Sequence, residues 1–86
     1  MKIILHKRFE KRYTKLRPAE KEKFKARRNL FLQDPFDQVL NNHTLSGRYK
    51  GYRSINISGD LRAVYRMIDQ DTAFFVAFGT HSQLYG

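Results

Sequence analysis

The 86-residue sequence contains no cysteine, only two prolines and only eight acidic residues. Without cysteine, neither a disulfide nor a thiolate nucleophile nor a cysteine zinc site is available. The longest apolar run, residues 73–78, is far shorter than the ~20 residues that a membrane helix requires. The opening apolar stretch of residues 3–5 turns charged at once, so we expect no signal peptide. A cytoplasmic location suits both absences.

The shortage of acidic residues is concentrated in the first third of the chain. Residues 1–28 contain twelve Lys and Arg against three acidic residues, whereas residues 29–86 contain five of each. The net charge of +9 is therefore carried entirely by residues 1–28. Such a field attracts polyanions, which favours nucleic acid or an acidic protein as partner over charge that serves solubility alone.

The first half of the chain has the pattern of a strand followed by two helices. A chain of this length has room for one modest core, so we expect residues 1–86 to form a single domain. Residues 2–5 are β-branched and apolar, which predicts a short strand. Apolar residues at helical spacing predict a helix over residues 6–16, and Pro18 ends it and begins a second helix that runs to about residue 33.

The predicted second helix has two apolar stripes instead of one. Ala19, Ala26 and Leu30 share the first stripe, and Phe24 and Phe31 share the second. We expect the first stripe to cover the sheet and the second to meet the preceding helix.

From Tyr52 onward the hydrophobic period changes to two. Strands are predicted over residues 53–57, 61–68 and 72–78, separated by turns. The predicted fold class is α+β: a small antiparallel four-stranded sheet in the order β-α-α-β-β-β, with a helical hairpin on one face. Alternation places Ile55 and Ile57 in the core, and Arg53 and Asn56 near or on the open face. It does not settle which side of strand 61–68 faces the core.

Several polar residues in the second half of the chain have the chemistry for cleaving RNA. His43 lies in a long loop and His81 follows the last strand, and two histidines can act as base and acid in one reaction. Asp60 can share this proton work, while Lys50, Arg53 and Arg62 can stabilise a phosphate. Tyr52 or Tyr85 can stack on a base. The alternative is that these are ordinary surface residues. No metal-ligand motif is present, so we expect neither a metal nor another cofactor.

Three segments of the chain resemble the YafQ branch of the RelE-like bacterial toxins. They are His43-Thr44-Leu45-Ser46-Gly47-Arg48-Tyr49-Lys50-Gly51-Tyr52-Arg53, Gly59-Asp60-Leu61-Arg62-Ala63-Val64-Tyr65-Arg66 and Gly79-Thr80-His81-Ser82-Gln83-Leu84-Tyr85. The order of the predicted elements also matches, so the resemblance spans nearly the whole chain. The spaced His-x-Leu-x-Gly and Gly-Thr-His-Ser-x-Leu-Tyr patterns are specific in combination.

This resemblance implies the toxin of a type II toxin–antitoxin pair, a ribosome-dependent endoribonuclease that cleaves mRNA in the A site and stops translation. It implies inhibition by a cognate antitoxin, which we expect to be acidic. The family's catalytic residues fall on His43, Asp60, Arg62, His81 and Tyr85. The residues that we expect to bind RNA are Arg48, Lys50, Tyr52, Arg53 and Asn56.

One position departs from the family pattern. Many YafQ-like chains carry a further catalytic histidine where this sequence has Asn56, and asparagine cannot exchange a proton near neutral pH. Three outcomes are open: His43 and His81 do the proton work with help from Arg62, cleavage is slower, or cleavage has been lost. In the last case the protein is a binding module for RNA or the ribosome, or its basic helices mainly dock an acidic antitoxin segment.

Overall fold

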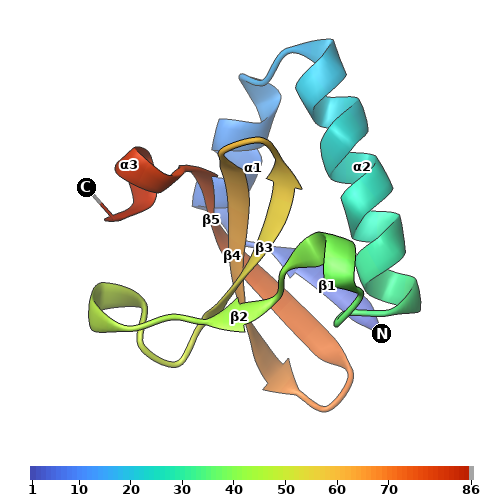
Figure 1. Ribbon diagram of the computed structural model, residues 1–86, viewed down its shortest axis with the longest axis vertical. Coiled ribbons are helices and arrows are strands. Elements are labelled where there is room, and N and C mark those ends of the chain that lie inside the picture. The colour runs from blue at the N-terminus through green and yellow to red at the C-terminus, as the bar shows by residue number, and fades with distance from the viewer. Residues whose placement is uncertain (86) are drawn as a thin grey trace.

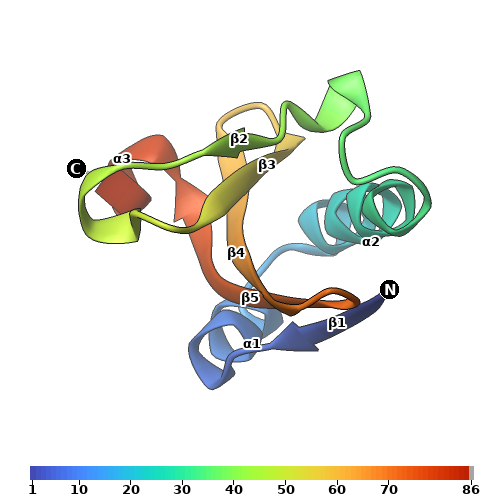
Figure 2. The same cartoon turned by 90° about the horizontal axis from the view of Figure 1, so that it is seen from below.

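Residues 1–85 form one curved sheet with a helical hairpin on its concave side, as the computed structural model shows (Figures 1 and 2). The predicted α+β class is confirmed. The strands are β1 (Lys2–Leu5), β2 (His43–Thr44), β3 (Arg53–Ser58), β4 (Leu61–Asp69) and β5 (Thr72–Thr80). The helices are α1 (Lys7–Thr14), α2 (Pro18–Gln33) and α3 (His81–Tyr85), with 3-10 turns η1 (Gln38–Leu40) and η2 (Gly47–Tyr49).

The strand order is β1-β5-β4-β3-β2. Strands β3, β4 and β5 form the predicted antiparallel meander. Two details of the prediction are wrong: β1 pairs parallel with β5, and β2 adds a fifth strand at the edge of β3. No tight turn joins β1 to the meander, because the helical hairpin and the long loop lie between them, so local turn chemistry does not set its direction. The two residues of β2 are too short to give a recognisable period.

The core contains the Phe24 and Phe31 stripe of α2, while Ala19 and Ala26 are exposed. The expectation that the alanine stripe covers the sheet is therefore wrong. A phenylalanine buries far more apolar area than an alanine, so the larger side chains decide which face of a helix packs inward. Phe9 from α1 joins the same cluster, so both helices contribute to one core.

A bulge in β5 lets two phenylalanines enter this core from the same strand. Val64 pairs with Ala77 and Tyr65 pairs with Phe75, which leaves Val76 as the extra residue. Phe75 and Phe78 therefore both point inward although they are three positions apart. On β4 the inward residues are Leu61, Ala63 and Tyr65, which assigns the side that alternation left open.

The other side of the sheet, which we call the open face, is convex and carries no helix of the hairpin (Figure 2). Strand register places Ser54, Asn56, Arg62 and Phe74 on it. Loop 45–52 and α3 flank this face. Asn56 and Arg62, two of the predicted site residues, lie on this face, and it therefore holds the candidate site.

The short helix α3 is fixed by a capping box and by a contact with α1. Thr80 Oγ1 accepts a hydrogen bond from Gln83 N (3.2 Å), and Gln83 Oε1 accepts one from Thr80 N (2.9 Å). Gln83 Oε1 also accepts a hydrogen bond from Arg12 of α1. Gly79 makes room for this arrangement, since a Cβ there would lie 2.9 Å from Gln83 Oε1. Buried Leu84 completes the attachment.

Replacing Phe75 with alanine should lower the free energy of unfolding by about 3–5 kcal/mol. Phe75 is 1% exposed and contacts the rings of Phe9, Phe31 and Tyr65. Phe36→Ala is the matched control, because Phe36 is 65% exposed and should lose less than about 1 kcal/mol. Urea unfolding followed by circular dichroism measures both values. Equal losses would show that the aromatic cluster is not the source of stability.

Replacing Gln83 with alanine should release α3 without unfolding the sheet. It removes the capping box and the Arg12 contact, at a cost of about 1 kcal/mol. Amide exchange of residues 81–85 should speed up, while that of β4 and β5 stays slow. Ser82→Ala, one residue away and exposed, serves as control and should leave exchange unchanged. Unaltered protection of residues 81–85 in Gln83→Ala would mean that Leu84 alone holds the helix.

Candidate active site on the open face

A pocket of about 540 Å³ opens on the open face, where the β2 segment, β4 and α3 meet. Four of the five residues predicted to be catalytic line it: His43, Arg62, His81 and Tyr85. They come from three separate parts of the chain, so the fold is what brings them together. We call this cavity the histidine pocket. Its full lining is Asn41, His43, Thr44, Leu45, Ser46, Arg62, His81 and Tyr85.

The tautomer of His43 is set by a backbone carbonyl. His43 lies on β2 opposite Ser54, and its Nδ1 is 2.8 Å from the carbonyl oxygen of Asn41. A carbonyl oxygen can only accept, so Nδ1 carries the proton and the neutral ring has its lone pair on Nε2. Asn41 has a left-handed backbone (φ 46°), a conformation that asparagine tolerates better than most residues. His43 is therefore held with a proton acceptor available to the pocket.

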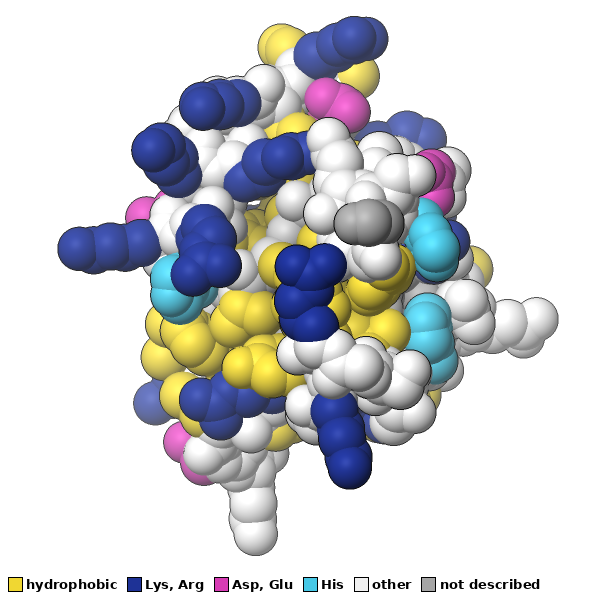
Figure 3. Space-filling model, turned by 90° about the vertical axis from the view of Figure 1, so that its left-hand side faces the viewer, with side chains coloured by type: hydrophobic (Ala, Val, Ile, Leu, Met, Phe, Trp, Pro, Cys, Tyr) yellow, Lys and Arg dark blue, Asp and Glu magenta, His cyan; other side chains and the backbone are white. Residues whose placement is uncertain are grey.

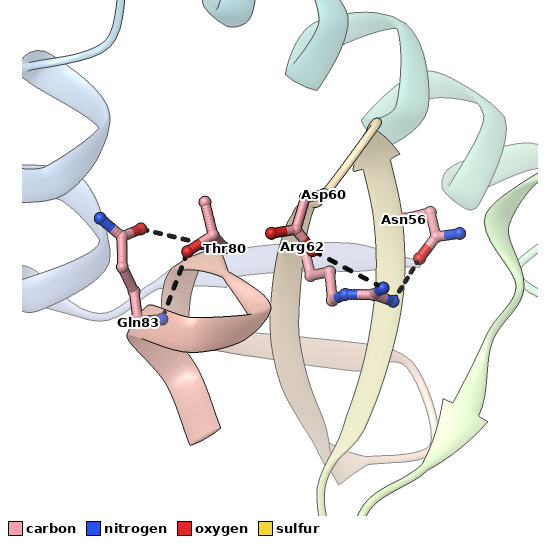
Figure 4. Close-up of polar contacts among 5 residues, drawn as sticks. All are labelled: Asn56, Asp60, Arg62, Thr80 and Gln83. Atoms are coloured by element: carbon pink, nitrogen blue, oxygen red, sulfur yellow. Dashed lines mark hydrogen bonds and ion pairs between the residues drawn. The ribbon is translucent and has the colours of Figure 1, made fainter. Parts of the chain in front are cut away.

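Arg62 is held by two acceptors on the open face (Figure 4). Its Nη1 donates to Asn56 Oδ1 at 3.0 Å, and its Nη2 lies 3.9 Å from Asp60 Oδ1. The Asp60 side chain is 59% exposed, so its ion pair with Arg62 is worth little in water. The Asn56 contact is the stronger restraint on the guanidinium. Neither Asn56 nor Asp60 lines the histidine pocket, so both reach it through Arg62.

His81 and Tyr85 lie one turn apart on α3, with their ring centroids 4.9 Å apart in an edge-to-face arrangement. On its other side Tyr85 contacts Tyr49 of η2, at 5.9 Å between centroids. The capping box of α3 thus sets the position of both predicted residues. The Thr80-x-x-Gln83 spacing is the sequence signal for this helix, and the sequence analysis, which ended the last strand at residue 78, did not predict it. Gly86 lies outside the described residues.

Three buried polar atoms on or beside this face have no hydrogen-bond partner within residues 1–85: Ser54 Oγ, Arg62 Nε and Tyr85 Oη. Buried polar groups are normally paired, and exceptions concentrate at functional sites. Arg62 and Tyr85 line the histidine pocket, and Ser54 lies opposite His43 in the strand register. The sequence analysis did not single out Ser54. Its alternation with Ile55 was the available signal, since it places Ser54 on the open face.

None of the five predicted RNA-binding residues is among those that line this pocket. Arg53 shares the inward face of β3 with Ile55, so its predicted place on the open side is wrong. Its Nε donates to Asn42 Oδ1 at 2.7 Å, and its guanidinium lies 5.1 Å from the Phe36 ring. The inward placement of Arg53 follows from the two-residue period of a strand, because residues 53, 55 and 57 share one face. Lys50 is exposed at the end of η2.

Arg48 and Tyr52 line a second cavity of about 370 Å³, which we call the aromatic pocket. It lies on the open face over β5 and the N-terminal end of α1. Its lining is His6, Arg8, Arg48, Tyr49, Tyr52, Phe74, Val76 and Ala77.

Positive charge surrounds the open face on the α1 side. Arg8, Lys11, Arg12 and Lys15 line a groove of about 580 Å³ that ends at Gln83 of α3. Figure 3, which looks onto this side of the molecule, shows Lys and Arg gathered at the upper left and extending through the centre, apolar side chains around the middle, and histidine at both the left and the right edges. Groups of His, Asp or Glu arranged to hold a metal ion do not occur among residues 1–85. No helix in that range is long and apolar enough to cross a membrane.

Comparison with solved structures finds the same fold in bacterial toxins. YafQ from E. coli strain BL21(DE3) is 26% identical, with a TM-score of 0.78 over 98% of this chain and 97% of that chain. YafQ in the E. coli DinJ–YafQ complex is 25% identical, with a TM-score of 0.76 over the same shares. The YoeB/ParE toxin of Agrobacterium tumefaciens shares the fold at 21% identity, with a TM-score of 0.77 over 94% of this chain and 99% of that chain.

A search of curated protein sequences gave no match. The model of one protein family, described as the bacterial toxin YafQ of type II toxin–antitoxin systems, matches residues 1–86. This match covers the whole chain and confirms the resemblance seen in its three segments. The chain therefore belongs to the YafQ family of type II toxin–antitoxin toxins.

Proposed function

We propose that this toxin is a metal-independent endoribonuclease that cleaves mRNA in the ribosomal A site and so stops translation. The observation that supports this most strongly is the convergence of His43, Arg62, His81 and Tyr85 on one pocket. The pocket thus combines two proton-exchanging groups, a fixed cation and an aromatic ring, which are the groups that phosphodiester cleavage by a 2′-hydroxyl requires.

In the proposed reaction, the 2′-oxygen of the substrate attacks the adjacent phosphorus and the bond from phosphorus to the 5′-oxygen breaks. Nε2 of His43 takes the proton from the 2′-hydroxyl, a role supported by its Nδ1–H contact with Asn41. His81, in its protonated form, gives a proton to the departing 5′-oxygen. The products are a 2′,3′-cyclic phosphate and a 5′-hydroxyl, so atoms and protons balance without a metal or water.

Arg62 stabilises the negative charge that develops on the phosphate oxygens. Its Nη1 donates to Asn56, whereas its Nη2 is only loosely held, 3.9 Å from Asp60 Oδ1, and is therefore the amino group that donates to the phosphate. Asp60 assists by orienting this guanidinium, and its part in proton transfer stays a prediction. Tyr85 supports the His81 ring through the edge-to-face contact between the two rings.

Asn56 stands where many YafQ-like chains have a catalytic histidine, and in this protein its role is to hold Arg62 in position. Its amide oxygen holds Arg62 at any pH, whereas a protonated imidazole at this position would repel the guanidinium. We propose that His43 and His81 carry the proton transfers and that Asn56 positions the cation. The alternative function is a binding module without turnover, which has the same pocket but no cleavage.

The basic surface of α1 supports binding to the ribosome. Arg8, Lys11, Arg12 and Lys15 share one groove, and Lys50 and Arg48 lie on loop 45–52 across the open face. Such a surface fits ribosomal RNA phosphates, and it also fits the acidic antitoxin that we propose as the inhibitory partner. Both partners place the protein in the cytoplasm.

Removing either histidine should abolish cutting without unfolding the protein. We expect His81→Ala and His43→Ala each to slow single-turnover cleavage of mRNA on programmed ribosomes by about 100-fold or more. Mapping the 3′ ends of the mRNA measures this loss. The double variant should cleave only slightly more slowly than the slower of the two single variants, because both groups act in one step.

Ser82→Ala is the matched control for this experiment, since Ser82 is exposed and adjacent to His81 on α3. It should cut at the normal rate, and all variants should unfold at similar temperatures. Unimpaired cutting by folded His81→Ala would refute the assignment of the acid. A wild-type protein that binds programmed ribosomes but leaves the mRNA whole would favour the binding module.

Replacing Asn56 with alanine should slow cleavage about tenfold or more, because a hydrogen bond to a charged group is worth about 1.5–3 kcal/mol. The loss should appear in the limiting rate and not in the toxin concentration that gives half the maximal rate. Ser58→Ala, at the end of the same strand, is the control and should change neither value. An unchanged rate in Asn56→Ala would show that Arg62 needs no help from position 56.

A further inference from the structure

The aromatic pocket lies outside the proposed cleavage machinery, and its chemistry is that of a nucleotide-binding site. Its volume of about 370 Å³ falls within the range of small-ligand sites, roughly 300–1,000 Å³. Among the lining residues, four carry rings: His6, Tyr49, Tyr52 and Phe74. None of the lining residues that the structure describes is acidic.

A single arginine lies against two of these rings. The guanidinium carbon of Arg66 is 6.0 Å from the Tyr52 centroid and 5.9 Å from the Phe74 centroid. His6 lies on Phe74, at 5.7 Å between centroids. Arg66 is exposed, and the rings of His6, Tyr52 and Phe74 are only partly covered. Planar cations and partly exposed rings are the surfaces on which proteins stack unpaired bases.

An unbroken series of ring contacts joins this pocket to the histidine pocket. Tyr52 contacts Tyr49 at 6.1 Å, Tyr49 contacts Tyr85 at 5.9 Å, and Tyr85 contacts His81 at 4.9 Å. The two cavities are therefore neighbours on the same face, separated only by Tyr49 and Tyr85. A ligand that continues from one pocket to the other passes along aromatic surface.

The charges of the aromatic pocket specify an anionic ligand. Arg8 and Arg48 line it and Arg66 lies at its rings, while the aliphatic part is limited to Val76 and Ala77. A protein helix would need a longer apolar groove for its own apolar stripe. Single-stranded RNA supplies both the phosphates and the planar bases that this surface matches.

We propose that the aromatic pocket is a second RNA subsite, which binds an unpaired nucleotide flanking the one that is cut. This inference rests on the proposed function, since it assumes that the histidine pocket holds the scissile phosphate. The bound base stacks among Arg66, Tyr52 and Phe74, and Arg8 and Arg48 face its phosphates. The subsite contributes to affinity and to the placement of the strand, and it takes no part in proton transfer.

The first test measures binding to the isolated protein. The probe is a fluorescein-labelled 2′-O-methyl oligoribonucleotide, which lacks the attacking hydroxyl, in lengths from about two to about eight nucleotides. By fluorescence anisotropy, affinity should rise with length in the wild type. Phe74→Leu and Arg66→Gln should weaken binding of the longest probe roughly five- to hundredfold, while Tyr52→Phe, which keeps the ring, should bind normally.

The chain offers a matched control for these variants on the opposite face of the sheet. Arg53 and Phe36 form the same kind of pair, with the guanidinium 5.1 Å from the ring. Phe36→Leu should leave the affinity for the longest probe within twofold of wild type. Because Arg66 is exposed, Arg66→Gln should fold like the wild type, which thermal unfolding checks. A loss of the same size in Phe36→Leu and in Phe74→Leu would overturn the subsite.

The second test separates this inference from the proposed function. On programmed ribosomes, Phe74→Leu should raise the toxin concentration for half-maximal cutting and retain the limiting rate. If the wild type cuts but the variants match it in both binding and cutting, the subsite is wrong and the function stands. If nothing cuts but the variants lose length-dependent binding, the function is wrong and the RNA subsite stands. If binding depends neither on the length of the RNA probe nor on the rings of Tyr52 and Phe74, the surface binds a protein segment instead.

Discussion

The β5 bulge at Val76 is the constraint on which both faces of this small sheet depend. Without it, strict alternation after Phe75 would turn Phe78 outward and Gly79 inward. With it, Phe75 and Phe78 both enter the core, and Gly79 pairs with Arg62 on the open face. The chain then leaves the sheet beside Arg62, where Thr80 and Gln83 begin α3. One extra residue thus connects the packing of the core to the position of His81.

The sequence predicts most of the elements of this fold but not all of their arrangement. The strands of the meander and both long helices were predictable, because each has a clear period and defined turns. The direction of β1 was not, since it depends on a pairing across most of the chain. The stripe of α2 was misassigned because counting apolar residues gave alanine the same weight as phenylalanine, and burial free energy scales with area.

The candidate site was predictable as a set of residues but not as an arrangement. The motifs identified His43, Arg62, His81 and Tyr85, and the pocket brings all four together. Alternation places Ser54 on the open face but does not show that its hydroxyl is buried without a partner among residues 1–85, and no spacing reveals the ring contacts of Tyr49. Arg53 was misplaced although its parity with Ile55, two residues away, was visible in the sequence. Its aliphatic stem and its contact with Phe36 let it lie at the rim of the inward face.

The excess positive charge lies in the N-terminal part of the chain, whereas the residues of the histidine pocket lie in the C-terminal part. The fold brings the two sets of residues together. The N-terminal residues supply a field that draws in phosphates but hold no member of the histidine pocket, whereas the C-terminal half is nearly balanced in charge. Arg8 lines both the basic groove and the aromatic pocket, and Arg12 is bonded to the helix that carries His81. The contact between Arg12 and Gln83 therefore ties the basic groove to the histidine pocket. If the proposed function holds, an acidic antitoxin segment bound in this groove would lie against Gln83 of α3 and would act on RNA binding and on the position of His81 together.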